Sequence, residues 1–186
     1  MSEPADLAAS PRDLLRGAAA VFGEDEIAAW CGDLLAARAA FDDPELPSLL
    51  WLGGRVARWE LEREAEPGED RYWPRVWGAR GLLYVWRPPV GGDVVAGLGD
   101  PAWRVREMCA KAAALRELGE AAEDLAYLLD DGTPRVRAAA ARALGAVGEG
   151  EHALGLRDAL LDPDEAVREA ASRALDVLRE RLDRDV

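Results

Sequence analysis

The stretch "DDGTPRVRAAAARALGAVG", residues 130–148, contains a turn, a helix start and a helix made largely of alanine and arginine. Nearly the same order of residues occurs in "GDPAWRVREMCAKAAAL" (99–115) and in "LDPDEAVREAASRALDVL" (161–178). Repetition at a fixed spacing is the sequence signature of a repeat architecture. The spacing of these three stretches therefore decides the fold before any single helix does.

The same residue types recur every 31 residues in the three stretches. The columns are Asp100, Asp131 and Asp162; Val105, Val136 and Val167; Arg106, Arg137 and Arg168; Lys111, Arg142 and Arg173; and Ala112, Ala143 and Ala174. One period upstream the chain has Glu69, Arg75, Arg80 and Gly81, with Pro74 in the valine column. The sequence therefore predicts four repeats over residues 69–186, of which the first and the last are degenerate.

Within one copy, residues 133–147 predict an amphipathic helix, because apolar side chains recur on one side at about 100° per residue. This stripe consists of Val136, Ala140, Ala143, Leu144 and Val147. A shorter helix, ending in "LLDD" or "LLDP", is expected to follow and to cover the stripe. Gly119 and Gly148 separate the longer helix from the shorter one, as glycine often does near a helix C-terminus.

The repeats resemble the HEAT-repeat family, in particular the short PBS-lyase HEAT-like repeats. The resemblance rests on "DPAWRVR", "DGTPRVR" and "DPDEAVR", each followed by an alanine-rich helix. It implies an all-α fold, a right-handed α-solenoid of helix pairs. It also implies a ladder between repeats, formed by an Asp and an Arg six residues later. The matching pairs are Asp100/Arg106, Asp131/Arg137 and Asp162/Arg168, with Glu69/Arg75 as a variant that has a longer acid.

Upstream of the repeats, residues 11–22, 24–40 and 47–65 predict three helices. We interpret residues 1–68 as an N-terminal helical cap, because the end of a repeat array needs a polar outer face. The third helix is expected to bury Leu49, Leu52, Val56 and Trp59 and to expose Glu60. "AEPGED" (65–70) is expected to join the cap to the repeats, and "RPPVGGD" (87–93) to be a loop. Cap and repeats are expected to pack as one continuous domain.

Composition limits the classes of function that the chain can have. The chain has 186 residues, a net charge of −13 and 49% hydrophobic residues, which indicates a folded rather than a disordered chain. No apolar run approaches the roughly 20 residues of a membrane span, and the start lacks a signal peptide, so a cytoplasmic location is expected. The acidic balance disfavours nucleic-acid partners. Cys31 and Cys109 are expected to be reduced and buried.

Little in the sequence points to catalysis. His152 is the only histidine, which excludes a two-histidine metal site, and we expect it to face solvent. No glycine-rich phosphate loop follows a strand, and no cysteine pair has metal or redox spacing. We therefore expect no catalytic residue, no metal and no cofactor.

A partner site is predicted on the helices that carry the valine and arginine columns, which the resemblance places on the concave surface. Its basic row consists of Arg80, Lys111, Arg142 and Arg173, with Trp73, Trp77, Tyr84 and Met108 beside it. Such a groove suits an acidic, partly apolar protein segment, since Trp and Arg dominate interface energies. Alternatively, the tryptophans pack in the core, and the row balances acids such as Glu107 and Glu169.

These observations favour a noncatalytic scaffold or adaptor that binds another protein on the concave face. One alternative is a DNA-binding or DNA-repair protein, because some alkylpurine DNA glycosylases resemble this fold. Another is a tetrapyrrole-attachment lyase, the class after which the short repeats are named. Repeat scaffolds host many functions, so the fold alone does not decide among them.

Overall fold

The computed structural model describes residues 2–64 and 69–183, and these residues form α-helices and short 3-10 helices without any β-strand. The all-α prediction is confirmed for this part of the chain. Backbone contacts divide the chain into two compact units, Met1–Asp93 and Val94–Val186. The boundary expected at residue 68, the single continuous domain and the handedness of the solenoid stay predictions. Residues 65–68 of the expected joint lie outside the described residues.

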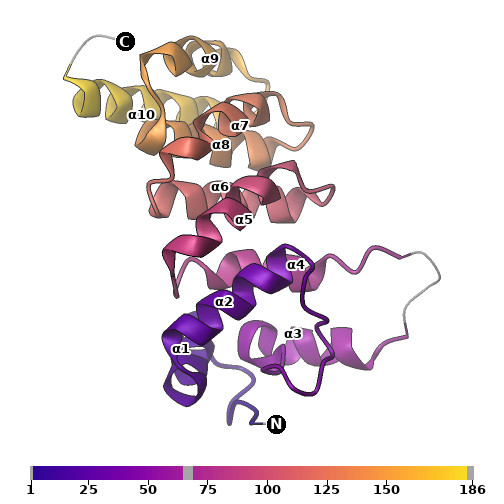
Figure 1. Cartoon of the computed structure of the whole chain (residues 1–186). Helices are drawn as coiled ribbons and strands as arrows, with labels where there is room; N and C mark the ends of the chain where they lie inside the picture. Colours follow the sequence, from indigo (N-terminus) through magenta and orange to yellow (C-terminus); the bar gives the residue numbers. More distant parts are fainter. Residues whose placement is uncertain (1, 65–68, 184–186) are drawn as a thin grey trace. The chain divides into compact units, whose positions relative to one another are not determined.

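The second unit contains two layers of helices (Figure 1). The long-helix layer consists of α6 (Trp103–Leu115), α8 (Pro134–Val147) and α10 (Glu165–Leu182), and α8 packs between the other two. The short-helix layer contains α7 (Ala122–Tyr127), which packs on α8, and α9 (Ala153–Asp158), which packs on α10. The predicted alternation of a longer and a shorter helix is therefore confirmed.

The short elements repeat with the period of the sequence. Each short α-helix lies between two 3-10 helices: η1 (Pro88–Val90), α5 (Gly91–Ala96) and η2 (Gly97–Gly99); η3 (Gly119–Ala121), α7 and η4 (Leu128–Asp130); η5 (Gly150–His152), α9 and η6 (Ala159–Leu161). Corresponding elements begin 31 residues apart. The prediction of a loop at residues 87–93 is wrong. The prolines there fix φ near the helical value, and they start a 3-10 helix that continues into α5.

Local chemistry explains why α8 begins where it does. Pro134 occupies the first turn, where its missing N–H costs nothing. The Oδ1 atom of Asp131 accepts the N–H of Thr133 at 2.7 Å and so fixes the turn before the helix. Val136 and Leu144 of the predicted stripe are fully buried. On the α10 side, a Cβ atom added to Gly145 would lie 2.9 Å from the Cα atom of Ala174, so this glycine allows the two helices to approach closely.

The first unit is built from α1 (Pro11–Phe22), α2 (Glu24–Leu35), α3 (Leu50–Glu62) and α4 (Trp73–Gly81). Within it, α2 packs on α4 and α1 packs on α3. The helix expected to run to residue 40 ends at Leu35, and Ala37 then adopts a left-handed φ of 53°. The bounds of α1 agree with the sequence prediction, and α3 is shorter than predicted at both ends.

The prediction for the faces of α3 is wrong in its second half. Gly54 has φ 54° and ψ −131°, which breaks the helix and changes which side chains face inward. Val56 and Trp59 are consequently 55% and 60% exposed, whereas Glu60 is fully buried. The buried carboxylate is paired, because Arg63 Nε donates to its Oε2 atom at 2.8 Å and Arg71 Nε to its Oε1 atom at 2.7 Å.

Both cysteines are free and buried, as predicted. Burial raises the pKa of the Cys31 thiol to about 12 and also raises the pKa of Cys109, so neither is a reactive thiolate at neutral pH. No helix in the described ranges is both long and apolar enough to cross a membrane.

Candidate functional site

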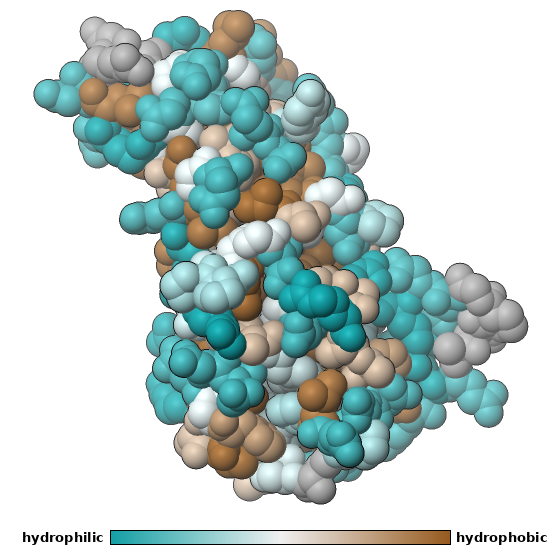
Figure 2. Space-filling model, in the orientation of Figure 1, coloured by the Kyte–Doolittle hydropathy of each residue, from teal (hydrophilic) through white to brown (hydrophobic). Residues whose placement is uncertain are grey.

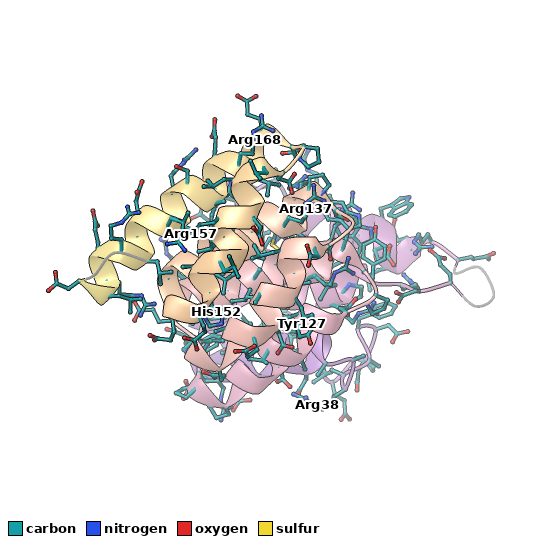
Figure 3. The ribbon with its side chains drawn as sticks, turned by 90° about the horizontal axis from the view of Figure 1, so that it is seen from above. Arg38, Tyr127, Arg137, His152, Arg157 and Arg168 are labelled. Atoms are coloured by element: carbon teal, nitrogen blue, oxygen red, sulfur yellow. The ribbon has the colours of Figure 1, made fainter. Side chains whose placement is uncertain are left out.

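The long-helix layer is tied together by arginine residues that reach from one repeat to the next. Arg137, labelled in Figure 3, donates from Nε to Asp162 Oδ2 at 2.7 Å and from Nη2 to Asp162 Oδ1 at 2.9 Å. Its Nη1 atom donates to the carbonyl of Asp131, in its own repeat, at 2.8 Å. Each such arginine therefore joins the turn before its own helix to the turn of the following repeat.

Arg106 makes the same bridge one repeat earlier, from Nε to Asp131 Oδ2 at 2.7 Å and from Nη1 to the carbonyl of Asp100 at 2.7 Å. Arg168, in the last repeat, donates to the carbonyls of Asp162 and Pro163. The degenerate first copy differs, because Arg75 Nη1 lies 2.8 Å from Asp70 Oδ1, one residue after the expected Glu69, and Glu69 accepts hydrogen bonds from Arg63.

The ladder carboxylates are ionised more readily than free aspartate. The hydrogen bond from Arg137 lowers the pKa of Asp162 from its ordinary value, against the opposing effect of burial. For Asp131, burial raises the pKa, but the hydrogen bonds from Arg106 and from the N–H of Thr133 together lower it below its ordinary value. At both carboxylates, hydrogen bonding and charge pairing together therefore outweigh desolvation.

Two of the four residues of the basic row are paired with nearby acids. Lys111 Nζ lies 2.7 Å from Glu107 Oε1, and Arg173 Nη2 lies 2.5 Å from Glu169 Oε2. Arg142 differs, because it is exposed and forms no ion pair within residues 2–64 and 69–183. Its Nη1 atom donates only to the carbonyl of Ala138 in its own helix, at 3.2 Å.

Lys111 and Arg142 line one hollow of about 260 Å³ on the long-helix layer. The other lining residues are Glu107, Pro134, Arg135, Ala138, Asp164 and Ala166. The carboxylate of Asp164 is occupied, since it accepts the N–H groups of Ala166 and Val167 at the start of α10. The hollow therefore combines small apolar walls with cations at its rim, of which Arg142 has the greatest freedom to bind a ligand.

A cluster of aromatic and basic residues adjoins this hollow, and the sequence prediction missed it. The guanidinium carbons of Arg104 and Arg135 lie 4.3 Å and 5.4 Å from the centre of the Trp103 ring. Arg135 also lies 3.1 Å from the buried Glu107 carboxylate, which it shares with Lys111. Arg104 and Arg135 are one period apart, so a search of all charged columns could have found them.

The N-terminal half of the predicted site lies in the first unit, and the prediction that Trp77 lies on the binding surface is wrong. Trp77 is only 2% exposed and stacks on the half-buried Trp73, with the centres of the two rings 5.7 Å apart. It is therefore a core residue and not a surface anchor. Arg80 donates to the carbonyl of Leu52, and burial lowers the pKa of its guanidinium. Tyr84 is exposed beside Arg12, whose Cζ lies 6.0 Å from the ring centre.

Met108 and His152 are both shielded from solvent, Met108 in part and His152 almost completely. Met108 is half-buried on α6. His152 is buried rather than facing solvent, because its Nδ1 atom accepts the N–H of Glu149 at 2.8 Å and so closes the start of η5. Within the part of the chain that the structure describes, no group of three His, Cys, Asp or Glu side chains is placed to hold a metal ion.

Repeated helix pairs joined by Arg–Asp bridges define an α-helical repeat protein. Residues 93–176 match the family model of HEAT repeats, so the resemblance to HEAT repeats is confirmed over this part of the chain.

Among the solved structures that are similar to the chain are the following two. A chain of the complex of CpcE and CpcF of phycocyanin lyase from Nostoc sp. PCC7120 has a TM-score of 0.59 and 25% identity, over 95% of this chain. The present chain spans only 63% of that chain. Human deoxyhypusine hydroxylase in complex with glycerol has a TM-score of 0.54 and 19% identity, over 91% of this chain and 72% of that one, and it supports the fold alone. No curated protein matches the chain in sequence.

Proposed function

We propose that the chain is a noncatalytic HEAT-repeat scaffold that binds a partner protein at the hollow of the long-helix layer. The observation that carries this proposal is Arg142, an exposed guanidinium without an ion pair in the described residues, at the rim of a hollow of about 260 Å³. The match to HEAT repeats and the likeness to a chain of a two-protein complex support a role in protein interaction.

The chemistry of the hollow favours an acidic, partly apolar segment of the partner. Arg142 offers a charge-assisted hydrogen bond to a carboxylate. Pro134 and Ala138 offer apolar contact beside it. Lys111 and Arg135 hold the Glu107 carboxylate and add positive potential at the same rim. A carboxylate that binds there is attracted by these cations, and no existing ion pair has to break.

Arg142→Glu tests the proposal directly. It is a better variant than reversal of Lys111, which would leave the buried Glu107 beside a new acid. The probe is a fluorescein-labelled peptide that alternates glutamate and leucine, and its affinity is measured by fluorescence anisotropy. We expect the variant to bind about tenfold more weakly or worse, because attraction becomes repulsion. Its free energy of unfolding should change by less than about 1 kcal/mol, since the side chain is exposed.

Arg157→Glu is the matched control, because Arg157 is also exposed and belongs to the short-helix layer (Figure 3). It makes the same change in charge and should leave the affinity within about twofold of the original chain. Equal weakening by both variants would mean that only net charge matters and would contradict the proposed site. Salt-dependent binding of duplex DNA in a gel-shift experiment would contradict the choice of a protein partner.

A second candidate is a subunit of a chromophore lyase, favoured by the likeness to the phycocyanin lyase complex. Cys31 and Cys109 are buried with raised thiol pKa values, which disfavours covalent attachment through this chain's own cysteines. Absorption spectra of biliverdin, a linear tetrapyrrole, with and without the protein would separate the two candidates. A shifted and intensified absorption band at equimolar protein would favour the lyase subunit, and an unchanged band would favour the scaffold.

A further inference from the structure

The short-helix layer carries a strongly acidic surface that the proposed function does not use. Residues 119–131 contain five acidic side chains and no basic one. Asp131 is buried in the ladder, whereas Asp124 and Asp130 are exposed, as is Asp158 one repeat later. None of these three exposed aspartates forms an ion pair within the described ranges. In contrast, α8 on the long-helix layer contains three arginines and no acid.

Large apolar side chains are exposed on the short helices of the same layer. Tyr127 on α7 is 79% exposed, Leu154 on α9 is 65% exposed, and Leu161 is 86% exposed. Figure 2 shows hydrophobic residues (brown) among hydrophilic ones (teal) over the upper part of the chain, where Figure 1 draws α7 and α9. Clustered exposed apolar side chains mark interaction surfaces more often than isolated ones do.

A hollow of about 220 Å³ lies between α7 and α9 on this surface. Ala126, Leu129, Gly155, Ala159 and Leu161 supply its apolar lining, and Asp130, Asp158 and Asp162 its polar lining. Gly155 leaves room there, since a Cβ atom at this position would lie 3.0 Å from Leu129. The hollow can accept an apolar side chain between two exposed carboxylates.

The end of the repeat array does not explain the exposed leucines. Leu154 and Leu161 correspond, one period earlier, to Glu123 and Asp130. Both of those acids are exposed although a further repeat follows them. These positions therefore face outward in both copies. The leucines are exposed for this reason, and not because no further repeat covers them.

We infer that this acidic face, comprising Asp124, Tyr127, Asp130, Leu154, Asp158 and Leu161, binds a basic amphipathic helix of a partner protein. The apolar side of such a helix would cover Tyr127 and Leu161 and place a side chain in the hollow. Its lysines or arginines would meet Asp130 and Asp158. An amphipathic helix in a groove supplies apolar anchors at a spacing of three or four residues, and charge complementarity selects the basic kind.

A separate partner fits this face better than a second copy of the chain. The most basic surface of a second copy would be its long-helix layer, where Lys111, Arg135 and Arg173 are already paired with acids and Arg142 alone of these four cations has no described ion pair. Contact between two different faces of identical chains would also be head-to-tail and would form open filaments unless it closed into a ring. The inference is independent of the proposed site at Arg142.

The test uses the full chain and a fluorescein-labelled amphipathic helix of leucine and lysine. A scrambled peptide of the same composition has the same charge but no apolar face. We expect saturable binding of the amphipathic peptide, at least about tenfold tighter than binding of the scrambled one. Asp130→Lys with Asp158→Lys should weaken it about tenfold or more, and Leu161→Ser severalfold. A zero-length carbodiimide should cross-link peptide lysines to Asp130 or Asp158.

Asp42→Lys with Glu62→Lys is the matched control, because both residues are exposed and the change in charge is the same. It should keep the affinity within about twofold, as should Arg142→Glu, which tests the other face. Equal binding of both peptides, an unchanged affinity of the Asp130/Asp158 variant with an unchanged melting temperature, or cross-links only elsewhere would overturn the inference. Self-association in sedimentation experiments that this variant abolishes would overturn the choice of a separate partner.

Discussion

The unit at residues 94–186 repeats one small set of contacts, whereas the unit at residues 1–93 depends on a few large side chains and one buried carboxylate. In the first case Arg106 and Arg137 make nearly identical bridges over alanine-rich helices. In the second case Trp77 fills the core and Glu60 pairs with two arginines. Repetition spreads stability over equivalent contacts, while the N-terminal unit concentrates it in single residues.

The sharpest test of this contrast is Trp77→Ala, for which we expect the largest effect. Removal of a fully buried indole should lower the free energy of unfolding by about 3–5 kcal/mol. Trp59→Ala is the control, because that ring is 60% exposed, and it should cost less than about 1 kcal/mol. Urea denaturation followed by circular dichroism measures both. Similar losses for the two variants would show that the N-terminal core is not centred on Trp77.

A smaller loss is expected from Arg137→Ala, which removes one bridge between repeats. The variant leaves the buried Asp162 carboxylate without its arginine, so about 1–3 kcal/mol should be lost. Arg168→Ala is the control within the same column, because Arg168 donates to carbonyls and not to the carboxylate of a later repeat. Thermal unfolding should show the smaller decrease for Arg168→Ala. The reverse order would refute the ladder as the main tie between repeats.

Close packing of the long helices predicts a still smaller effect. Gly145→Ala should destabilise by about 1 kcal/mol, because contact with the Ala174 backbone outweighs the better helix propensity of alanine. At Gly132 nothing lies within 4 Å of an added Cβ atom, so Gly132→Ala should stay within about 0.5 kcal/mol of the original chain. Denaturation midpoints compare the two. An equally stable Gly145→Ala variant would mean that α8 and α10 adjust freely.

The weakest expected effect is a difference in acid sensitivity. The pKa of Asp162 is lowered in the folded chain, so this carboxylate stabilises the fold above the ordinary aspartate value near 3.8. That contribution is lost as the pH falls below this value and through the folded pKa. Melting temperatures between neutral pH and pH 3 should therefore fall less steeply for Arg137→Ala than for the original chain. Parallel curves would show that the Arg137 bridge does not lower the pKa of Asp162.

Much of the second unit could be predicted from the sequence, because its contacts are periodic. The 31-residue spacing located Asp131, Arg137 and the start of α8, and the corresponding short elements begin at the same spacing. The candidate site was found only in part. Lys111 and Arg142 follow from the period, but the contact of Arg135 with Trp103 joins two repeats, and the period by itself does not specify such a contact.

The first unit was predicted less well, because its faces depend on one backbone angle. A regular helix from residue 47 places Trp59 inside and Glu60 outside, and the break at Gly54 reverses both. Glycine adopts a positive φ without steric cost, so the residue permits the break but does not require it. The carbonyl of Leu7 lies 2.5 Å from where a Cβ atom of Gly54 would be, which shows what the glycine accommodates.

The sequence by itself determined the helical class, the period and the columns of charge, because each follows from the order and spacing of residues along one chain. Tertiary structure decided which members of a column are already neutralised and which are available. Lys111 and Arg142 are equivalent in the repeat, yet Glu107 pairs with the first and no described carboxylate pairs with the second. Burial and pairing depend on neighbours across space, and the period of a sequence does not specify those neighbours.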